Sequence, residues 1–327
     1  MRRRTFCLAL SAVTATVALS ARAQKPRRPV IGCLVLGPLE NGRDNFASVR
    51  HGLAATGCVE GRDFDVEFRA ANYQIDRLRE VAADLVERNV AVIVTLATPC
   101  LEVALSATKL IPIVFYTGVD PVENRFVSSL NHPGGNATGI FTLGDPLNTK
   151  RLELLHDIAP TADAVAILWS PAIGPPRERA MGKVKEAATK LGIRAIEEFA
   201  TTRDDFAAAF DAIIRDNCRA LLVPGDAVFN NDIDAVVALA AKFRIPAMYA
   251  FRDYVVAGGL ASYGPDFTEG YQVMGTYAAR ILRGESPSNL PVQQITKVEF
   301  VLNAKAAKGL DLRFPSNLLA RADEVIE

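Results

Sequence analysis

The chain has 327 residues, which is long for one hydrophobic core and suits two lobes of roughly 100–150 residues each. Half of the residues are apolar, so a packed globular protein is expected rather than a disordered one. The 37 basic and 37 acidic side chains cancel. This balance argues against nucleic acid as a partner, because nucleic-acid binders usually carry a basic excess.

The first 23 residues have the pattern of an export signal. Arginines at positions 2 to 4 precede an apolar run, Phe6–Leu19, that is too short and too polar to span a bilayer. Ala21-Arg22-Ala23 fits a cleavage site, so we expect cleavage after Ala23 and a periplasmic product. Both the general secretory route and the twin-arginine route fit the start of the chain.

Apolar strands alternate with helical patterns along the rest of the chain, which is typical of parallel sheets with helices on both faces. Strands are expected at Val30–Gly37, Phe64–Ala70, Ala91–Leu96, Ile113–Tyr116, Ala164–Trp169, Arg194–Phe199, Ala220–Val223, Ala247–Phe251, Leu260–Tyr263 and Gln293–Leu302. Helices are expected at Arg43–Thr56, Asp76–Arg88, Pro99–Lys109, Asn148–Ile158, Pro176–Leu191, Arg203–Asp216, Ile233–Phe243 and Thr268–Leu282, with helical pieces over Asn303–Glu327. The glycine-rich loop 131–139 predicts the first passage between lobes.

Sequence motifs of common catalytic sites are absent. There is no nucleophile elbow, P-loop or dinucleotide fingerprint, and the three histidines are isolated, so neither a metal nor a cofactor is expected. A binding protein is the simpler interpretation. An enzyme of racemase type, with Cys100 and Cys218 as paired acid and base, stays open, although Cys218 precedes its strand. Cys33 and Cys58 complete a scattered set that we expect to be small buried side chains.

A helix start directly follows an apolar strand at Thr98-Pro99. Proline suits the first turn of a helix, where no N–H is needed, and threonine suits the N-cap before it. Free backbone N–H groups at such a start bind anions, commonly a carboxylate or a phosphate. In an open α/β sheet this start lies at the carboxyl ends of the strands, where ligands bind.

Other polar and aromatic residues also fall just past predicted strand ends. Together with the helix start, the candidate ligand-binding residues are Thr98, Pro99, Tyr116, Thr117, Asp120, Trp169, Ser170, Asp226, Tyr249, Phe251 and Ser262. An amino acid would place its carboxylate at Thr98-Pro99 and its ammonium at Asp226 or Asp120. An aromatic side chain would lie against Tyr116, Trp169 or Tyr249. A cap, turn or core role is an alternative for each.

Several segments carry a resemblance to a known family. They are Thr98-Pro99, Ile113–Pro121, Leu130–Gly139, Lys150–Leu155, Ala257–Pro265 and Phe314–Asp323. With these segments the chain resembles the substrate-binding proteins of bacterial ABC transporters, in the group that includes tryptophan and tyrosine binders.

The resemblance implies an α/β fold of the type I periplasmic-binding class. Each of two lobes is a mostly parallel sheet flanked by helices, and three crossing segments join them. We expect residues 30–137 and about 253–290 in the first lobe, and 138–252 and about 291–327 in the second. A small anionic or zwitterionic ligand, with an aromatic amino acid favoured, would be captured by hinge closure. A monomer would deliver it to an inner-membrane permease, without enzyme activity. An alternative function, as a ligand-sensing module for a membrane receptor, would use the same cleft.

Overall fold

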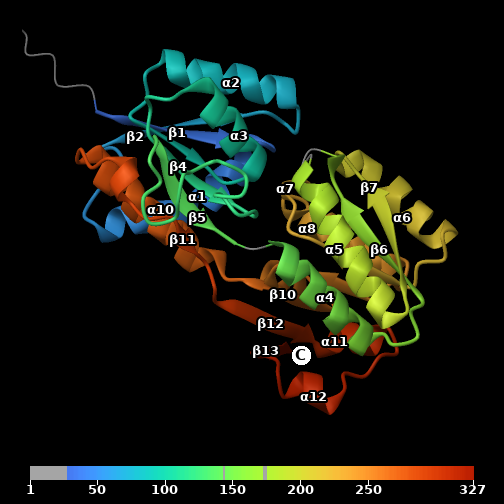
Figure 1. Ribbon diagram of the computed structural model, residues 1–327. Helices are drawn as coiled ribbons and strands as arrows, with labels where there is room; N and C mark the ends of the chain where they lie inside the picture. Colours follow the sequence, from blue (N-terminus) through green and yellow to red (C-terminus); the bar gives the residue numbers. More distant parts are fainter. Residues whose placement is uncertain (1–27, 143, 172–174) are drawn as a thin grey trace, which may run out of the picture.

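Two lobes make up the molecule (Figure 1). A cavity lined by residues of both lobes lies between them. The computed structural model describes residues 28–142, 144–171 and 175–327. The signal peptide predicted for residues 1–23 lies outside these ranges. Within them, no helix is long and apolar enough to cross a membrane.

Each lobe is built on one sheet. The first sheet has the order β11 (Gln293–Gln294), β5 (Ala137–Phe141), β4 (Ile113–Thr117), β3 (Val92–Thr95), β1 (Val30–Val35) and β2 (Asp65–Ala70). The second has the order β13 (Glu324–Ile326), β12 (Val298–Asn303), β10 (Ala261–Pro265), β9 (Ala247–Tyr249), β8 (Ala220–Val223), β6 (Ala164–Trp169) and β7 (Arg194–Phe199). Strands β10 and β12 pair antiparallel, and the other described pairs are parallel.

Helices cover both faces of each sheet. The first lobe has α1 (Leu39–Ala55), α2 (Ile75–Glu87), α3 (Thr98–Ala107), α10 (Phe267–Leu282) and η3 (Pro287–Asn289). The second lobe has α4 (Gly144–Ile158), α5 (Pro175–Leu191), η2 (Arg203–Asp205), α6 (Phe206–Arg215), α7 (Ala227–Asn230), α8 (Ile233–Lys242), α9 (Arg252–Val256), α11 (Ala304–Gly309) and α12 (Ser316–Leu319). The two-lobe fold of mostly parallel sheets flanked by helices is therefore confirmed.

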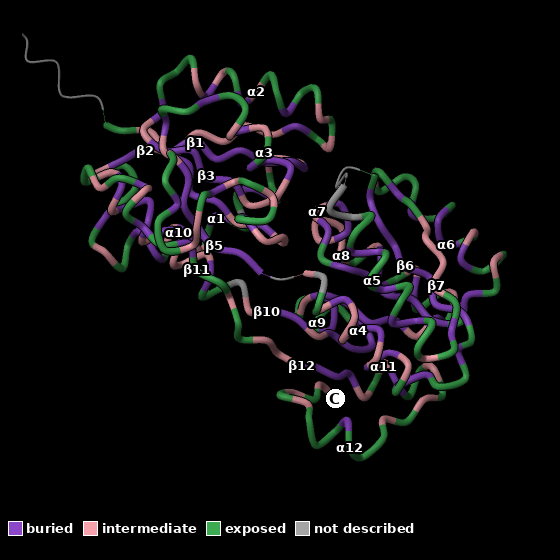
Figure 2. Tube along the Cα trace, in the orientation of Figure 1, coloured by how far each residue is buried: buried purple, intermediate pink, exposed green. Residues whose placement is uncertain are grey.

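Alternation along the strands explains why both faces are covered. In β3, Val92 and Val94 join the core under α1 and α10, whereas Ile93 joins the core under α2 and α3. All three side chains are fully buried. A strand buried on both faces reads as a continuous apolar run, which is the pattern that the sequence shows. Figure 2 shows the buried strands inside each lobe and the exposed outer faces of the helices.

Helices α1 and α10 touch through glycines. A Cβ atom on Gly52 would lie 2.0 Å from the backbone oxygen of Gln272, and one on Gly275 would lie 2.1 Å from that of Val49. Neither position has room for a side chain, so the two helices approach to backbone contact. This contact holds α10 on the N-terminal lobe, although α10 lies near the C-terminal end of the sequence (Figure 1).

The strands change sheet three times within the described chain: after β5, after β10, and between β11 and β12. The boundaries differ from those predicted. Strand β5, which the sequence does not predict, pairs with β4, so the first lobe extends to Phe141. Strand β10 pairs with β9, so residues 253–265 belong to the second lobe. The loop 131–139 misled the prediction because it returns the chain to the same sheet.

Candidate functional site

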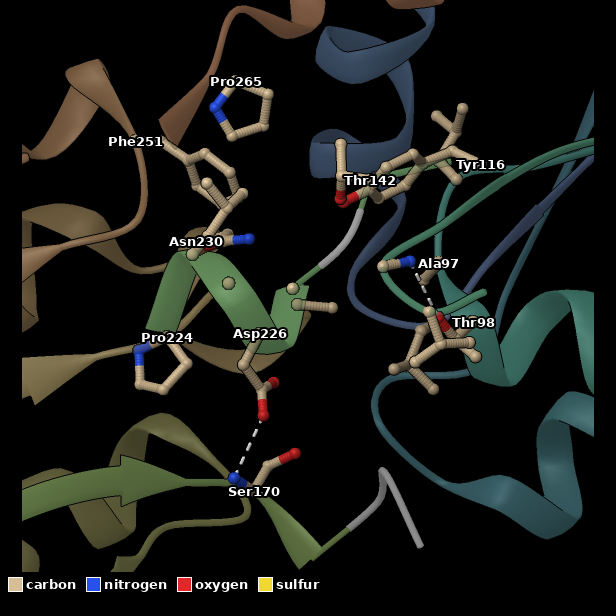
Figure 3. Close-up of a pocket in the computed structure, with 18 of the residues that line it drawn as sticks. Ala97, Thr98, Tyr116, Thr142, Ser170, Pro224, Asp226, Asn230, Phe251 and Pro265 are labelled. Carbon is tan, nitrogen blue, oxygen red and sulfur yellow. Dashed lines mark hydrogen bonds between the residues drawn. The ribbon is translucent and has the colours of Figure 1, made fainter. Parts of the chain in front are cut away.

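A cavity of about 230 Å³ lies between the lobes at the carboxyl ends of the strands. Seven predicted residues line it: Thr98, Pro99, Tyr116, Trp169, Ser170, Asp226 and Phe251. In Figure 3, Thr98 and Tyr116 face the cavity from the first lobe, and Ser170, Asp226 and Phe251 face it from the second. The rule that strand ends gather at one edge therefore placed seven of the eleven predicted residues in the wall. That these side chains contact a ligand stays a prediction.

Tyr249 and Ser262 do not line the cavity. Tyr249 is 1% exposed and stacks on Tyr254 with ring centroids 4.6 Å apart, inside the core under α6 and α8. Ser262 is also 1% exposed and lies in β10 between β9 and β12. Both residues belong to their strands rather than to the loops beyond, so the predicted position past the strand end is wrong for them.

Thr117 and Asp120 support the loop after β4 rather than the cavity wall. The Oγ1 atoms of Thr117 and Thr98 are 2.9 Å apart, which ties the end of β4 to the start of α3. Asp120 Oδ1 accepts the N–H groups of Val122 at 2.8 Å and Glu123 at 3.0 Å. The turn alternative therefore describes Asp120, and Asp226 is left as the candidate partner for an ammonium group.

The start of α3 is one residue earlier than an N-cap at Thr98 would require. Ala97 is the N-cap, and Thr98 is the first helical residue. Thr98 Oγ1 accepts the backbone N–H of Gly118 at 3.3 Å instead of capping its own helix. Ala97, Thr98 and Pro99 all line the cavity, so the positive end of this ten-residue helix faces it. This end favours an anionic group of a ligand.

Asp226 is a buried carboxylate at the end of β8. Its Oδ2 atom accepts the backbone N–H of Ser170 at 3.0 Å, and its Oδ1 atom accepts that of Val228 at 2.9 Å, so it also caps α7. The side chain is 3% exposed, and burial raises the pKa of Asp226, although the hydrogen bonds act in the opposite direction. Across the described ranges, no cationic side chain forms an ion pair with it.

Arg151 of α4 is a wall residue that the sequence prediction missed. Its Nε atom donates to Tyr263 O at 2.6 Å, Nη1 donates to Asn148 Oδ1 at 2.6 Å, and Nη2 lies 3.4 Å from Ala250 O. All three acceptors are neutral. The residue is 2% exposed, and burial lowers the pKa of Arg151 to about 10, so it stays charged at neutral pH. Among the described residues, no carboxylate pairs with it. Its only sequence signal is its place inside the segment Lys150–Leu155.

Aromatic rings and two unpartnered polar atoms complete the wall. Tyr116 packs edge-on against Tyr271, with centroids 6.1 Å apart, and its hydroxyl is 3.2 Å from Thr142 Oγ1. Trp169 Nε1 and Ser170 Oγ are buried and have no hydrogen-bond partner in the part of the chain that the structure describes. A buried donor without an acceptor is costly, so these atoms favour a ligand or a water that supplies one.

The cysteine pair of the racemase alternative is not assembled. Cys100 lies on α3 and packs in the core between the first sheet and α2, and Cys218 packs in the second lobe against α6. Neither lines the cavity. Burial raises the pKa of both thiols, that of Cys218 to about 11, so neither is poised as a base. Nor do the described His, Cys, Asp and Glu residues form a group of three that could hold a metal.

Side chains from both lobes also meet beside the cavity. Asn231 Nδ2 donates to Tyr73 Oη at 3.0 Å, which joins the residue after α7 to the loop after β2. Arg179 Nη1 lies 3.0 Å from Glu123 Oε2. The lobes are therefore in contact beside the cavity.

Comparisons with known proteins agree with this architecture. The model of the ABC transporter substrate binding protein family matches residues 41–326. A tyrosine-binding protein of Clostridioides difficile is 27% identical over 80% of this chain and 74% of its own length. A conserved domain protein of Vibrio cholerae is 28% identical with a TM-score of 0.81, covering 91% of this chain and 100% of its own.

A further solved structure shows the same fold. The ABC domain from Streptococcus pneumoniae in complex with L-Trp is 23% identical with a TM-score of 0.80, covering 91% of this chain and 100% of its own. Members of the matching family are extracytoplasmic and bind a small molecule for a transporter permease, and the Clostridioides relative is named as a binding protein. Because the family model matches most of its length and the fold agrees, the chain belongs to the ABC transporter substrate-binding proteins.

Proposed function

We propose that this protein captures an α-amino acid, with an aromatic side chain favoured, for an ABC importer. The observation that carries the proposal is the pair Arg151 and Asp226. Both are buried, they have opposite charges, neither has an ionic partner among the described residues, and both line the same cavity. A zwitterionic ligand brings the counter-charge for each.

The physical basis is the free energy of a buried ion. An ionised group that leaves water without a partner is strongly disfavoured, whereas a charge-assisted hydrogen bond is about twice as strong as a neutral one. The carboxylate of the ligand would lie toward Arg151 and the start of α3, and its ammonium would lie against Asp226. The donors Trp169 Nε1 and Ser170 Oγ offer further hydrogen bonds on the second-lobe wall.

The preference for an aromatic side chain is supported by the rings in the wall. Tyr116, Trp169, Phe251 and Tyr271 all line the cavity, and aromatic pairs prefer offset or edge-on packing that a bound ring can join. The names of the Clostridioides relative and of the Streptococcus complex point the same way.

The remaining parts of the proposal concern place and partner. We propose removal of residues 1–23, a periplasmic monomer and an inner-membrane permease as its partner. The absence of enzyme activity is part of the same proposal, and it is supported by relatives that are binding proteins.

Calorimetric titration of the chain lacking residues 1–23 tests the ligand class. L-tryptophan, L-tyrosine, L-phenylalanine and the aliphatic L-leucine are titrated. An amino acid that binds is compared with its analogues without the carboxylate and without the ammonium, which for L-tryptophan are tryptamine and indole-3-propionate. We expect binding of at least one amino acid and a loss of about tenfold or more for each truncated analogue of it, from the charged hydrogen bonds removed. Equal affinity for the amino acid and both analogues would refute the zwitterion assignment. Binding of aliphatic but not aromatic amino acids would refute the aromatic preference alone.

A further inference from the structure

The hydrogen bond between Tyr73 and Asn231 lies outside the charge pair that explains the ligand class. We propose that Tyr73 is a positioning residue that latches the closed state, holding α7 and its cap Asp226 against the first lobe. The inference rests on the proposed function, because α7 carries the residue assigned to the ammonium group of the ligand.

Helix α7 connects Asn231, which forms the latch, to Asp226, which is assigned to the ammonium group. Asp226 caps its N-terminus, and Asn231 is its C-cap, only one turn away. Tyr254 Oη donates to Asn230 Oδ1 at 3.0 Å, which anchors the same turn to the core of the second lobe. Since the turn is short and anchored, its two ends move as a unit. Asn231 also lines the cavity, so the latch and the ligand share one wall.

The loop that presents Tyr73 is held in an unusual backbone conformation. Asn72 and Tyr73 both have left-handed φ angles, 48° and 64°. This region is uncommon for residues other than glycine, and a bulky residue such as tyrosine keeps it only where the surroundings impose it. Here Tyr73 N donates to Leu36 O at 2.7 Å, and Asn72 N donates to Gly37 O at 3.3 Å. The hydroxyl is thereby aimed across the interlobe boundary rather than into solvent.

Gly37 supplies the space that the latch needs. A Cβ atom at this position would lie 2.5 Å from Asn231 Nδ2 and 2.9 Å from Tyr73 Oη. The φ angle of Gly37 is not left-handed, so alanine would cause no backbone strain there. Its methyl group would instead push apart the two atoms that form the bond. Gly37→Ala should therefore disrupt the hydrogen bond between Tyr73 and Asn231 directly.

The second interlobe pair differs in burial. The side chains of Arg179 and Glu123 are 43% and 65% exposed, and such ion pairs contribute little because water and salt screen them. Tyr73 is half-buried, and burial raises its pKa to about 12, so its hydroxyl stays neutral at physiological pH. We therefore assign the main restraint on opening to Tyr73 and Asn231.

Ligand dissociation kinetics test this assignment. Trp169 is the only tryptophan and lines the cavity, so its fluorescence reports occupancy by L-tyrosine or L-phenylalanine in stopped-flow experiments. We expect Tyr73→Phe to raise the dissociation rate about threefold to tenfold, the size of one net hydrogen bond, with the association rate changed less than about twofold. Gly37→Ala should raise it at least as much. Tyr277→Phe, which loses a hydroxyl bonded to Pro291 O within the first lobe, and Gly135→Ala, which meets nothing within 4 Å, are the matched controls.

The outcomes separate the latch from the function. If the wild type binds and Tyr73→Phe releases ligand at the wild-type rate, the latch is refuted while the proposed function stands. If no amino acid binds to the wild type, the proposed function fails. The latch is then decided by small-angle X-ray scattering of the ligand-free proteins. A larger radius of gyration for Tyr73→Phe and Gly37→Ala than for the wild type supports it, and equal radii refute it.

Discussion

The backbone N–H of Ser170 donates to Asp226 Oδ2 at 3.0 Å, which joins the end of β6 to the loop after β8 (Figure 3). Together with the N–H of Val228, this bond orients the carboxylate before any ligand arrives. A positioned acceptor needs little rearrangement on binding, and preorganisation of this kind raises affinity.

The first prediction concerns the charge of Asp226. Asparagine is also a good N-cap, so Asp226→Asn should keep the cap of α7 through the N–H of Val228, although its amide nitrogen cannot accept the N–H of Ser170. It removes the negative charge, and we expect the affinity for an aromatic amino acid to fall about 10-fold to 100-fold, measured by calorimetric titration. Asp120→Asn is the control, because Asp120 caps a turn instead of lining the cavity. Wild-type binding by Asp226→Asn, or an equal loss in Asp120→Asn, would contradict the assignment.

The second prediction concerns pH. Burial raises the pKa of Asp226, so the neutral form begins to accumulate at a pH above the usual range of aspartate. Since an ammonium group prefers the charged form, affinity should fall as the pH is lowered from neutral through this raised pKa.

The same shift has a consequence for stability, with a definite sign. A carboxyl whose pKa is higher in the folded than in the unfolded protein lowers the stability of the ligand-free fold when it is ionised. This loss of stability is fully present at a pH above the folded-state pKa and absent at a pH below the unfolded-state pKa. The stabilisation by ligand, measured as the rise in melting temperature, should therefore shrink on mild acidification. Asp226→Asn should lose this part of the pH dependence, and an unchanged profile in that variant would contradict the prediction.

The third prediction concerns Arg151. Arg151→Gln removes the charge while keeping a side chain that can hydrogen-bond, and affinity for an amino acid should fall about 10-fold to 100-fold. Affinity for a ligand without a carboxylate, such as tryptamine, should change much less. Lys150→Gln is the control on the same helix, since Lys150 forms a part-exposed ion pair with Glu153 at 2.7 Å. If both ligands weaken equally, Arg151 acts through the fold rather than through the carboxylate.

The fourth prediction tests the contact between α1 and α10. Gly52→Ala places a methyl group against the backbone of Gln272, and overpacking of this kind costs about 1–3 kcal/mol of unfolding free energy, occasionally more. Gly182→Ala in α5 meets nothing within 4 Å and serves as the control. Urea unfolding measures both. Equal stabilities would mean that the helices can separate without cost.

The sequence predicted the alternation of strands and helices because strands buried on both faces are continuous apolar runs. It predicted seven of the residues that line the cavity because parallel strand ends gather at one edge. It could not predict which face of the sheet Tyr249 lies on. Successive side chains along a strand point to opposite faces, so an error of one residue in the end of the strand reverses the predicted face. Arg151 was missed because a charged residue on a helix usually faces solvent, and only the packed structure shows the cavity beside it.

The lobe boundaries failed for a different reason. Glycine and proline in the loop 131–139 report a turn, but a turn between two strands of one sheet has the same composition as a passage between sheets. Only the pairing of β5 with β4 distinguishes the two.

The three changes of sheet also govern how the polypeptide matures during synthesis. The N-terminal half of the molecule is incomplete without α10 and β11. The other half is incomplete without β12 and β13, which end at Ile326. A nascent chain on the ribosome therefore completes the N-terminal half only after Gln294 and the other half only after Ile326. Premature termination anywhere before Gln293 therefore leaves both halves unfinished.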